Sequence, residues 1–245
     1  VIVVCSTIGP TAFAAGKGDD SSQRTGGEIG RESGNYFNQL DAVPRAEEIE
    51  TLRLEAVAVG RLLERGIDDR DDAALKEAIE RLGTILDTLG GAAIGVDKLA
   101  LLSELARAEF LLAWRTNDPG YYQRAADHYH SVVEATPRDG NALAWASAQL
   151  GMGSSLRRAA LRDVGTDRLQ RALSALRSSL EVLTPEDALE SWLQAQFATG
   201  LASMDIGRRE TGDLRFQEAL TAFRSAGEHV RQVRQPGDWR SEEHT

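Results

Sequence analysis

The chain has a single cysteine, Cys5, among its 245 residues. One cysteine supports neither a disulfide framework within the chain nor a thiolate metal site. The chain also has no excess of basic residues, because its 28 Lys and Arg stand against 38 Asp and Glu, which gives a formal net charge of −10. Binding to phosphate groups needs a basic face, so this balance argues against nucleic acid and anionic membranes as partners.

No signature of a catalytic or nucleotide-binding site is present. The glycine-rich run 151–155 (GMGSS) falls inside an expected helix and lacks the preceding strand and the lysine of a phosphate loop. His128 and His130 lie near Asp127 and Glu134, but there is no H-E-x-x-H pairing and no second ligand cluster. We therefore predict a protein that is not an enzyme and that has no metal site and no cofactor.

What the chain does contain is an internal repeat. Trp145, Trp192 and Trp239 are each 47 residues apart, and the same period extends back through two earlier copies. A fixed period of this size indicates stacked supersecondary units. Within each copy, large and small residues recur at offsets of three and four, as on one face of an α-helix. The residues predicted to form the repeated core are Leu75, Tyr122, Leu169 and Phe216 at one position, Leu82, Tyr129, Leu176 and Phe223 at another, and the indoles of Trp145 and Trp192.

Each unit reads as two helices joined by a short turn, and no strand is needed anywhere. Asp72, Asp118, Thr166 and Asp213 stand just before the second helices, where a short oxygen-bearing side chain caps free N–H groups. Arginine recurs near the end of the first helices, where it suits the negative end of the helix dipole, at Arg115, Arg162 and Arg209. The expected helices span residues 44–66, 73–89, 97–115, 121–135, 142–162, 167–183, 186–206 and 213–233.

The repeated helix pair resembles a known family. A helix with Trp145, Ala146, Gln149 and Gly153 precedes a second helix with small residues, and the order is similar to the tetratricopeptide group, especially its longer variants with a WA-x-x-Q helix. The resemblance covers about residues 51–239 and implies an all-α, right-handed α-solenoid of antiparallel helix pairs that binds protein segments. The chain departs from the usual 34-residue period, and its first two copies lack the tryptophan.

The two ends of the chain carry other patterns. Residues 1–15 are uncharged and apolar and end in an A-x-A motif, which favours the remnant of a secretory signal over a buried first strand or helix. Residues 16–43 read as a flexible leader rich in Gly, Ser, Asp and Glu. The helical-repeat domain then spans 44–239. Residues 240–245 (RSEEHT) resemble a translated sequencing adapter, so we interpret them as a non-native scar.

These patterns lead to two functional hypotheses. The preferred one is a non-catalytic, exported bacterial scaffold, periplasmic or secreted, that binds a protein or peptide segment on the concave face of the array. The alternative is a regulatory or accessory domain of a longer polypeptide whose other part carries an enzyme. The groove candidates are Gln149, Gln196, Arg157 and Arg158. The two glutamines could equally hydrogen-bond neighbouring helices together, whereas the tryptophans read as core and not as an exposed ladder.

Overall fold

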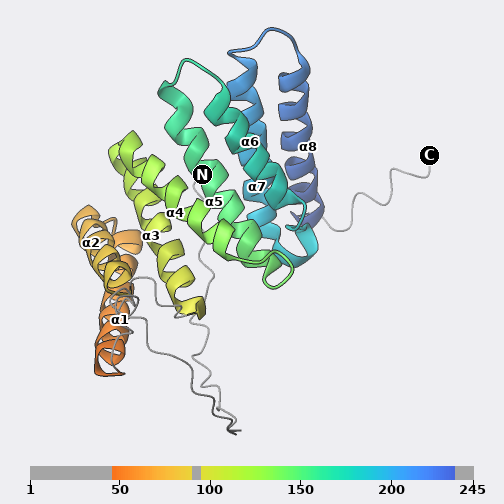
Figure 1. The fold of residues 1–245 in the computed structure, drawn as a ribbon. Coiled ribbons are helices and arrows are strands. Elements are labelled where there is room, and N and C mark those ends of the chain that lie inside the picture. Colours follow the sequence, from red (N-terminus) through yellow and green to blue (C-terminus); the bar gives the residue numbers. More distant parts are fainter. Residues whose placement is uncertain (1–45, 90–94, 235–245) are drawn as a thin grey trace, which may run out of the picture. The chain divides into compact units, whose positions relative to one another are not determined.

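The computed structural model describes residues 46–89 and 95–234, and this part of the chain is all-helical, with no strand. Eight α-helices follow one another, and each packs against the next along the chain (Figure 1). They are α1 (Ala46–Asp68), α2 (Asp72–Leu89), α3 (Gly95–Thr116), α4 (Pro119–Ala135), α5 (Ala142–Ala159), α6 (Asp167–Leu180), α7 (Pro185–Gly207) and α8 (Leu214–Arg234), with a short 3-10 turn η2 (Ala160–Arg162) after α5. The all-α prediction is confirmed for the described residues.

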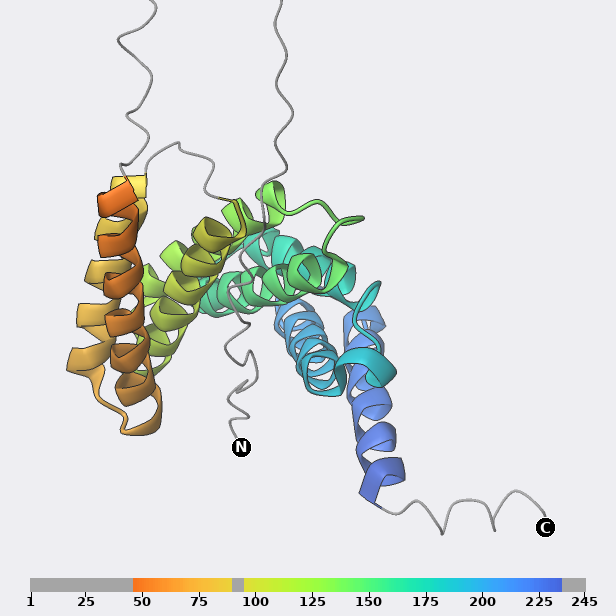
Figure 2. The same ribbon diagram turned by 90° about the horizontal axis from the view of Figure 1, so that it is seen from below.

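The contacts follow the predicted division into units. α1 packs on α2, α3 on α4, α5 on α6 and α7 on α8, and Figures 1 and 2 both show the first and last of these pairs side by side. Contacts between units run from each second helix to the next first helix, and also join α3 to α5 and α5 to α7. We refer below to α1, α3, α5 and α7 as first helices and to α2, α4, α6 and α8 as second helices.

Capping side chains explain where several helices begin. The carboxylate of Asp118 accepts a hydrogen bond from the Gly120 amide at the start of α4, as the sequence predicted. At the start of α2 the cap lies one residue earlier than predicted, because Asp71 accepts from the amides of Ala73 and Ala74. Thr166 stands at the predicted position before α6 but makes no capping hydrogen bond. The carboxylates of Asp71 and Asp118 thus satisfy N–H groups that a helix leaves free in its first turn.

The core contains most of the predicted repeat residues. Leu75, Leu82, Leu169 and Leu176 are at most 1% exposed, and Tyr122 is also buried. Tyr129, Phe223 and Trp145 are half-buried, whereas Trp192 is buried and its indole meets the ring of His229 on α8 edge-on. Phe216 is the exception to the predicted burial, because 42% of its surface is exposed. It lies on α8, which no later helix covers within the described residues.

Two repeated glycines allow close helix crossings. A Cβ at Gly153 on α5 would lie 2.6 Å from the side chain of Leu176 and 2.9 Å from the carbonyl oxygen of Ala172, both on α6. A Cβ at Gly200 on α7 would lie 2.6 Å from the ring of Phe223 on α8. The same residue type at the same offset therefore lets each first helix approach its second helix, as the sequence predicted.

Candidate functional site

A shallow hollow between α6 and α8, whose lining also includes side chains of α7 and exposes more apolar than polar surface, contains a predicted groove residue. Gln196 lies in its wall. Most of the lining groups are hydroxyls and amides, which can both donate and accept hydrogen bonds. The hollow is lined by Arg177 from α6, by Gln196, Thr199 and Ser203 from α7, and by Leu214, Gln217, Glu218, Thr221, Ala222 and Ser225 from α8.

Two hydroxyl groups in this hollow have no partner within the described part of the chain. Thr199 is 9% exposed and Ser203 is fully buried, yet neither Oγ atom makes a hydrogen bond there. The two residues are four apart on α7, so their side chains lie on one face of the helix. A buried hydroxyl without a partner costs about 1–3 kcal/mol. Both oxygen atoms are buried beneath the surface of the hollow, so a bound group reaches them only if the lining side chains move apart.

Arg177 lines both this hollow and a second one. Arg177 on α6 lies 3.1 Å from the carboxylate of Glu218 on α8, and both side chains line the first hollow. The second hollow shares Arg177 and is lined by Gln170, Leu173, Ser174, Arg177, Ser178, Glu181 and Arg215. Both hollows are therefore lined by residues of α6 and α8. These are second helices, whereas the sequence had suggested side chains of first helices.

The other predicted groove residues lie away from this hollow. Gln149 and Arg157 are only 8% and 7% exposed and offer little surface to a partner. A terminal nitrogen of Arg157 donates to the carboxylate of Asp205 on α7 at 2.8 Å, so this side chain links two first helices in the interior. Burial lowers the pKa of the Arg157 guanidinium, and Asp205 opposes that shift. Arg158 is half-buried on α5.

A buried ionic cluster in the second unit was not predicted. Glu109 on α3 is 2% exposed, and its carboxylate accepts from Nε of Arg124 and contacts Nδ1 of His128, each at 2.8 Å. Arg124 also stacks over the ring of Tyr121. The signal was available in the sequence, because the positions equivalent to Glu109 in the other units hold leucine or serine. A buried carboxylate in place of an apolar residue requires cationic partners nearby.

The described residues hold no group of three metal-binding side chains. His130, considered above for such a role, pairs instead with Glu134 at 3.4 Å on the surface of α4.

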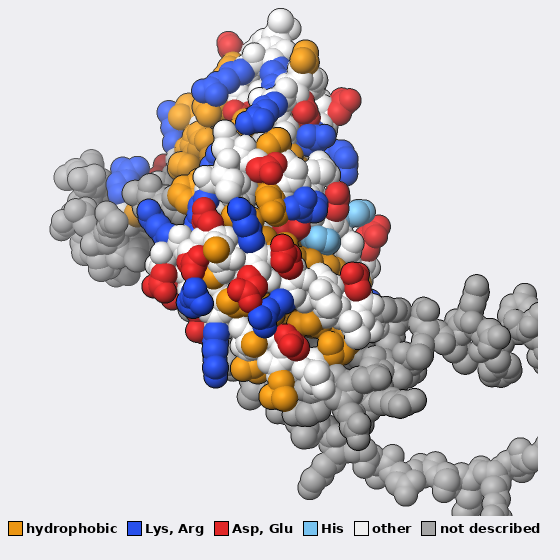
Figure 3. Space-filling model, turned by 90° about the vertical axis from the view of Figure 1, so that its left-hand side faces the viewer, with side chains coloured by type: hydrophobic (Ala, Val, Ile, Leu, Met, Phe, Trp, Pro, Cys, Tyr) orange, Lys and Arg blue, Asp and Glu red, His pale blue; other side chains and the backbone are white. Residues whose placement is uncertain are grey.

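Charges of both signs are interspersed over the face shown in Figure 3. Within the described ranges, none of the helices has the length and apolarity needed to span a membrane.

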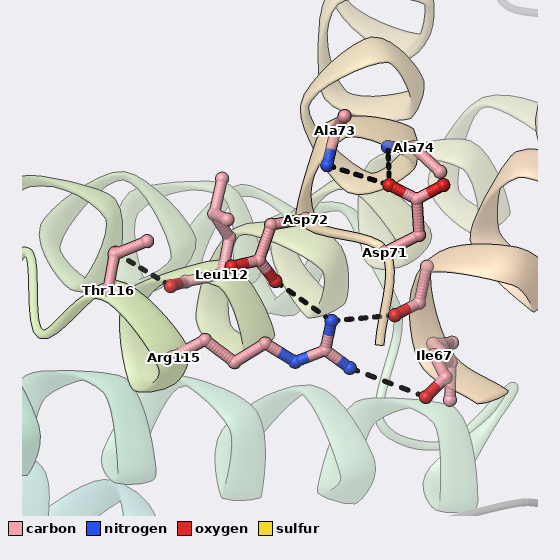
Figure 4. A network of polar contacts seen from close by, with 9 residues as sticks. Ile67, Asp71, Asp72, Ala73, Ala74, Leu112, Arg115 and Thr116 are labelled. Carbon is pink, nitrogen blue, oxygen red and sulfur yellow. Dashed lines mark hydrogen bonds and ion pairs between the residues drawn. The ribbon is translucent and has the colours of Figure 1, made fainter. Parts of the chain in front are cut away.

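The repeated arginines make a contact that the sequence placed on the wrong helix. Arg115, at the end of α3, donates to the carbonyl oxygens of Gly66 and Ile67 at the end of α1, and also to Asp72 (Figure 4). The dipole that it neutralises is therefore that of the preceding first helix and not that of its own helix. We call this contact the arginine clamp.

The clamp recurs two units later. Arg209 donates to the carbonyl oxygens of Ala160 and Leu161, which stand 49 and 48 residues before it, the same separations as for Arg115. It also donates to Gly165 at 2.6 Å. Arg162 makes a weaker version, with one bond of 3.3 Å to Asn117. The arginine period in the sequence thus records contacts between units.

Comparison with protein-family models, with curated proteins and with solved structures found no match to this chain.

Proposed function

We propose that the protein is a non-catalytic scaffold that binds a protein or peptide segment. The observation that carries this proposal is the hollow between α6 and α8, where Gln196 lies beside the unpaired hydroxyls of Thr199 and Ser203. An extended peptide carries alternating N–H and C=O groups, and hydroxyl and amide side chains can pair with both. The lining includes no aromatic ring, which disfavours ligands held by stacking.

The fold proposed for this function is a right-handed α-solenoid of antiparallel helix pairs, similar to tetratricopeptide arrays. Its support is the 47-residue period together with the order of helix contacts, in which the main contacts of each unit are with its neighbours. We place the protein in the periplasm or outside the cell because residues 1–15 have the pattern of a signal segment. That segment, the leader 16–43 and the scar 240–245 lie outside the described residues.

The test uses side-chain changes that keep the fold. Thr199→Val and Ser203→Ala remove hydroxyls that have no partner, so the folded state should be as stable as before or slightly more stable. Gln196→Ala shortens a half-buried side chain at the rim. A matched control is Ser131→Ala on α4, which removes a surface hydroxyl bonded only to the Asp127 carbonyl.

Immobilised wild-type protein would be panned against a phage-displayed library of random peptides, and the enriched peptides would be titrated against each variant. We expect the triple variant to lose at least tenfold in affinity and the Ser131→Ala control to bind as the wild type does. The proposal is overturned if the wild type enriches no peptide, or if the triple variant binds the enriched peptides with unchanged affinity.

A second candidate is a regulatory or accessory domain of a longer polypeptide that carries an enzyme elsewhere. The exposed apolar side chains of Phe216 and Leu220, on the outer face of α8, favour this second candidate, because another part of a longer polypeptide could pack on them. The genomic reading frame decides this question. A frame that continues past Trp239 into a catalytic domain supports the accessory role, and a native stop codon after Thr245 contradicts it.

A further inference from the structure

The outer face of α8 carries apolar side chains that are buried at the same repeat positions in α6. Leu169 and Leu173 on α6 are 0% and 2% exposed, whereas Phe216 and Leu220, 47 residues later on α8, are 42% and 47% exposed. The sequence positions are equivalent, so the helix itself does not explain the difference. The difference arises because α7 covers α6, and no described helix covers α8 in that way.

At three places in the described structure, another helix covers a second helix. α3 packs on α2, α5 on α4 and α7 on α6, so the covering element is always the next first helix. On α7 the buried cluster with α6 includes Ala195 and Ala202, with Ala198 packed against it. On α5 the residue equivalent to Ala198 is Gly151, whose added Cβ would lie 2.5 Å from the ring of Tyr129 on α4. On α5 and α7, small residues at these positions let the covering helix lie close to large side chains beneath it, whereas α3 carries Leu101 and Glu104 at the first two positions and Ala108 at the third.

The covering helix also brings the arginine clamp. On α3, α5 and α7 the clamp arginine stands seven residues after the last of the three packing positions: Ala108 and Arg115, Ser155 and Arg162, and Ala202 and Arg209. In the fourth unit the carbonyl groups that an arginine of this kind would reach belong to Gly207 and Arg208. They are equivalent to Gly66 and Ile67, which Arg115 binds. No side chain among the described residues donates to these two carbonyls.

We propose that the outer face of α8 is the docking site for the first helix of a further repeat unit. The occupant is an amphipathic helix with small residues at the positions of Ala195, Ala198 and Ala202 and an arginine at the position of Arg209. The small residues of this helix pack on Phe216 and Leu220, and its arginine donates hydrogen bonds to the carbonyl oxygens of Gly207 and Arg208. In the sequence, Trp239 stands in register with Trp192 of α7; it lies outside the described residues.

A second copy of this chain fits the site poorly. The helix that it would offer is α1, the first helix with no described unit before it. Leu54 and Val57 on α1 are exposed at the positions of Ala195 and Ala198, but the next packing position holds Arg61 in place of Ala202. Ala108, Ser155 and Ala202 are at most 3% exposed, so Arg61 would place an unpaired charge in that contact. The clamp position on α1 holds Asp68, which has no donor.

The probe is a peptide with the sequence of residues 185–210, which carries the α7 contacts and the clamp arginine. A fluorescently labelled form would be titrated into the full chain and followed by anisotropy. We expect saturable binding with one site per chain, at least tenfold weaker for the protein variant Leu220→Glu and unchanged for Val164→Glu, a control on a loop residue that is 97% exposed. Two peptide variants test the occupant itself. Ala202→Arg, which copies α1, should abolish binding, and Arg209→Ala should weaken it about threefold to tenfold.

Because a free peptide must first form its helix, a second measurement attaches residues 192–210 directly after residue 238 of the chain, so that Trp192 takes the place of Trp239. The extended protein should unfold at a higher temperature than the parent, and Leu220→Glu should cancel the gain. The site does not include the hollow between α6 and α8, so a loss of peptide binding there leaves this result unaffected. The proposal is overturned if neither peptide nor extension interacts, or if Leu220→Glu has no effect. Self-association of the unextended chain that Leu54→Glu and Leu220→Glu both abolish would assign the face to a second copy instead.

Discussion

Replacement of Arg157 should destabilise the fold, although the sequence pattern favoured this residue as a binding residue. Its guanidinium donates to the carboxylate of Asp205 at 2.8 Å, and both side chains are only 9% exposed. The pair joins α5 to α7 and therefore joins two units. We consider three variants: Arg157→Met, Asp205→Leu and the double change, which replaces both charged side chains with apolar ones.

The magnitude follows from what each variant leaves behind. Removing one member of a buried ion pair costs about 3–5 kcal/mol, because the other charge stays buried without a partner. Asp205→Leu leaves the arginine with no other carboxylate within ion-pair distance in the described structure, so it should fall at the upper end. Arg157→Met leaves Asp205 with Arg208 at 3.6 Å, so it should fall at the lower end. The double variant should be near neutral, since apolar replacement of a whole pair is often tolerated.

Urea unfolding followed by circular dichroism measures these differences, and hydrogen exchange in α5 and α7 localises them. For an array of this size the single variants should lower the melting temperature by roughly 10 °C, at about 2–4 °C for each kcal/mol. Our account of Arg157 fails if both single variants lose less than about 1 kcal/mol. It also fails if the double variant is as unstable as the sum of the two.

Three further predictions concern a packing contact, a polar contact and a cap. Gly153→Ala should destabilise the fold by about 1–3 kcal/mol in thermal melts, because its Cβ would lie 2.6 Å from a side chain on α6 and 2.9 Å from a backbone oxygen; Gly83→Ala, in open space within α2, should instead stabilise it by up to about 1 kcal/mol. Arg115→Ala should cost about 1.5–3 kcal/mol in urea unfolding, since three hydrogen bonds of a charged group are lost, whereas Arg162→Ala, with one bond of 3.3 Å, should cost less than about 0.5 kcal/mol. Hydrogen bonds from the first turn of α2 and from a neighbouring arginine lower the pKa of the Asp71 carboxyl. The stability that this carboxylate contributes is therefore present at neutral pH and is lost as the pH falls from about 4 through that lower pKa. Asp71→Ala should lower the melting temperature at pH 7 and have little effect at about pH 2, and an equal loss at both pH values would contradict this.

The sequence predicted the helices well because the repeat shows each structural position four times, once in every unit. An apolar residue that one unit replaces is still visible in the others, and Gly, Pro and Asp mark the turns between helices. The helix ends therefore agree within a few residues. The main difference is at the end of α5, where residues 160–162 form a 3-10 turn whose carbonyl groups at 160 and 161 bind Arg209.

The candidate site was predicted less well, because the period shows which residues share one face of a helix but not which other helix packs against that face. Gln149 and Gln196 share one repeat position, yet Gln149 is buried and Gln196 is half-buried at the edge of a hollow. The difference comes from which helix follows each unit, and no local pattern records that. Arg157 could not be paired with Asp205 from sequence, because the equivalent positions one unit earlier hold Phe110 and Arg158.

The arginine clamp gives the array an order of assembly. The carbonyl groups at the ends of two units' first helices are bound by a side chain that lies 49 residues later in the chain: Gly66 is bound by Arg115, and Ala160 by Arg209. During synthesis on a ribosome, a unit therefore emerges before the residue that completes it, and it gains its final hydrogen bonds only when the next first helix has been made. Each newly made unit therefore stabilises the unit that precedes it in the chain.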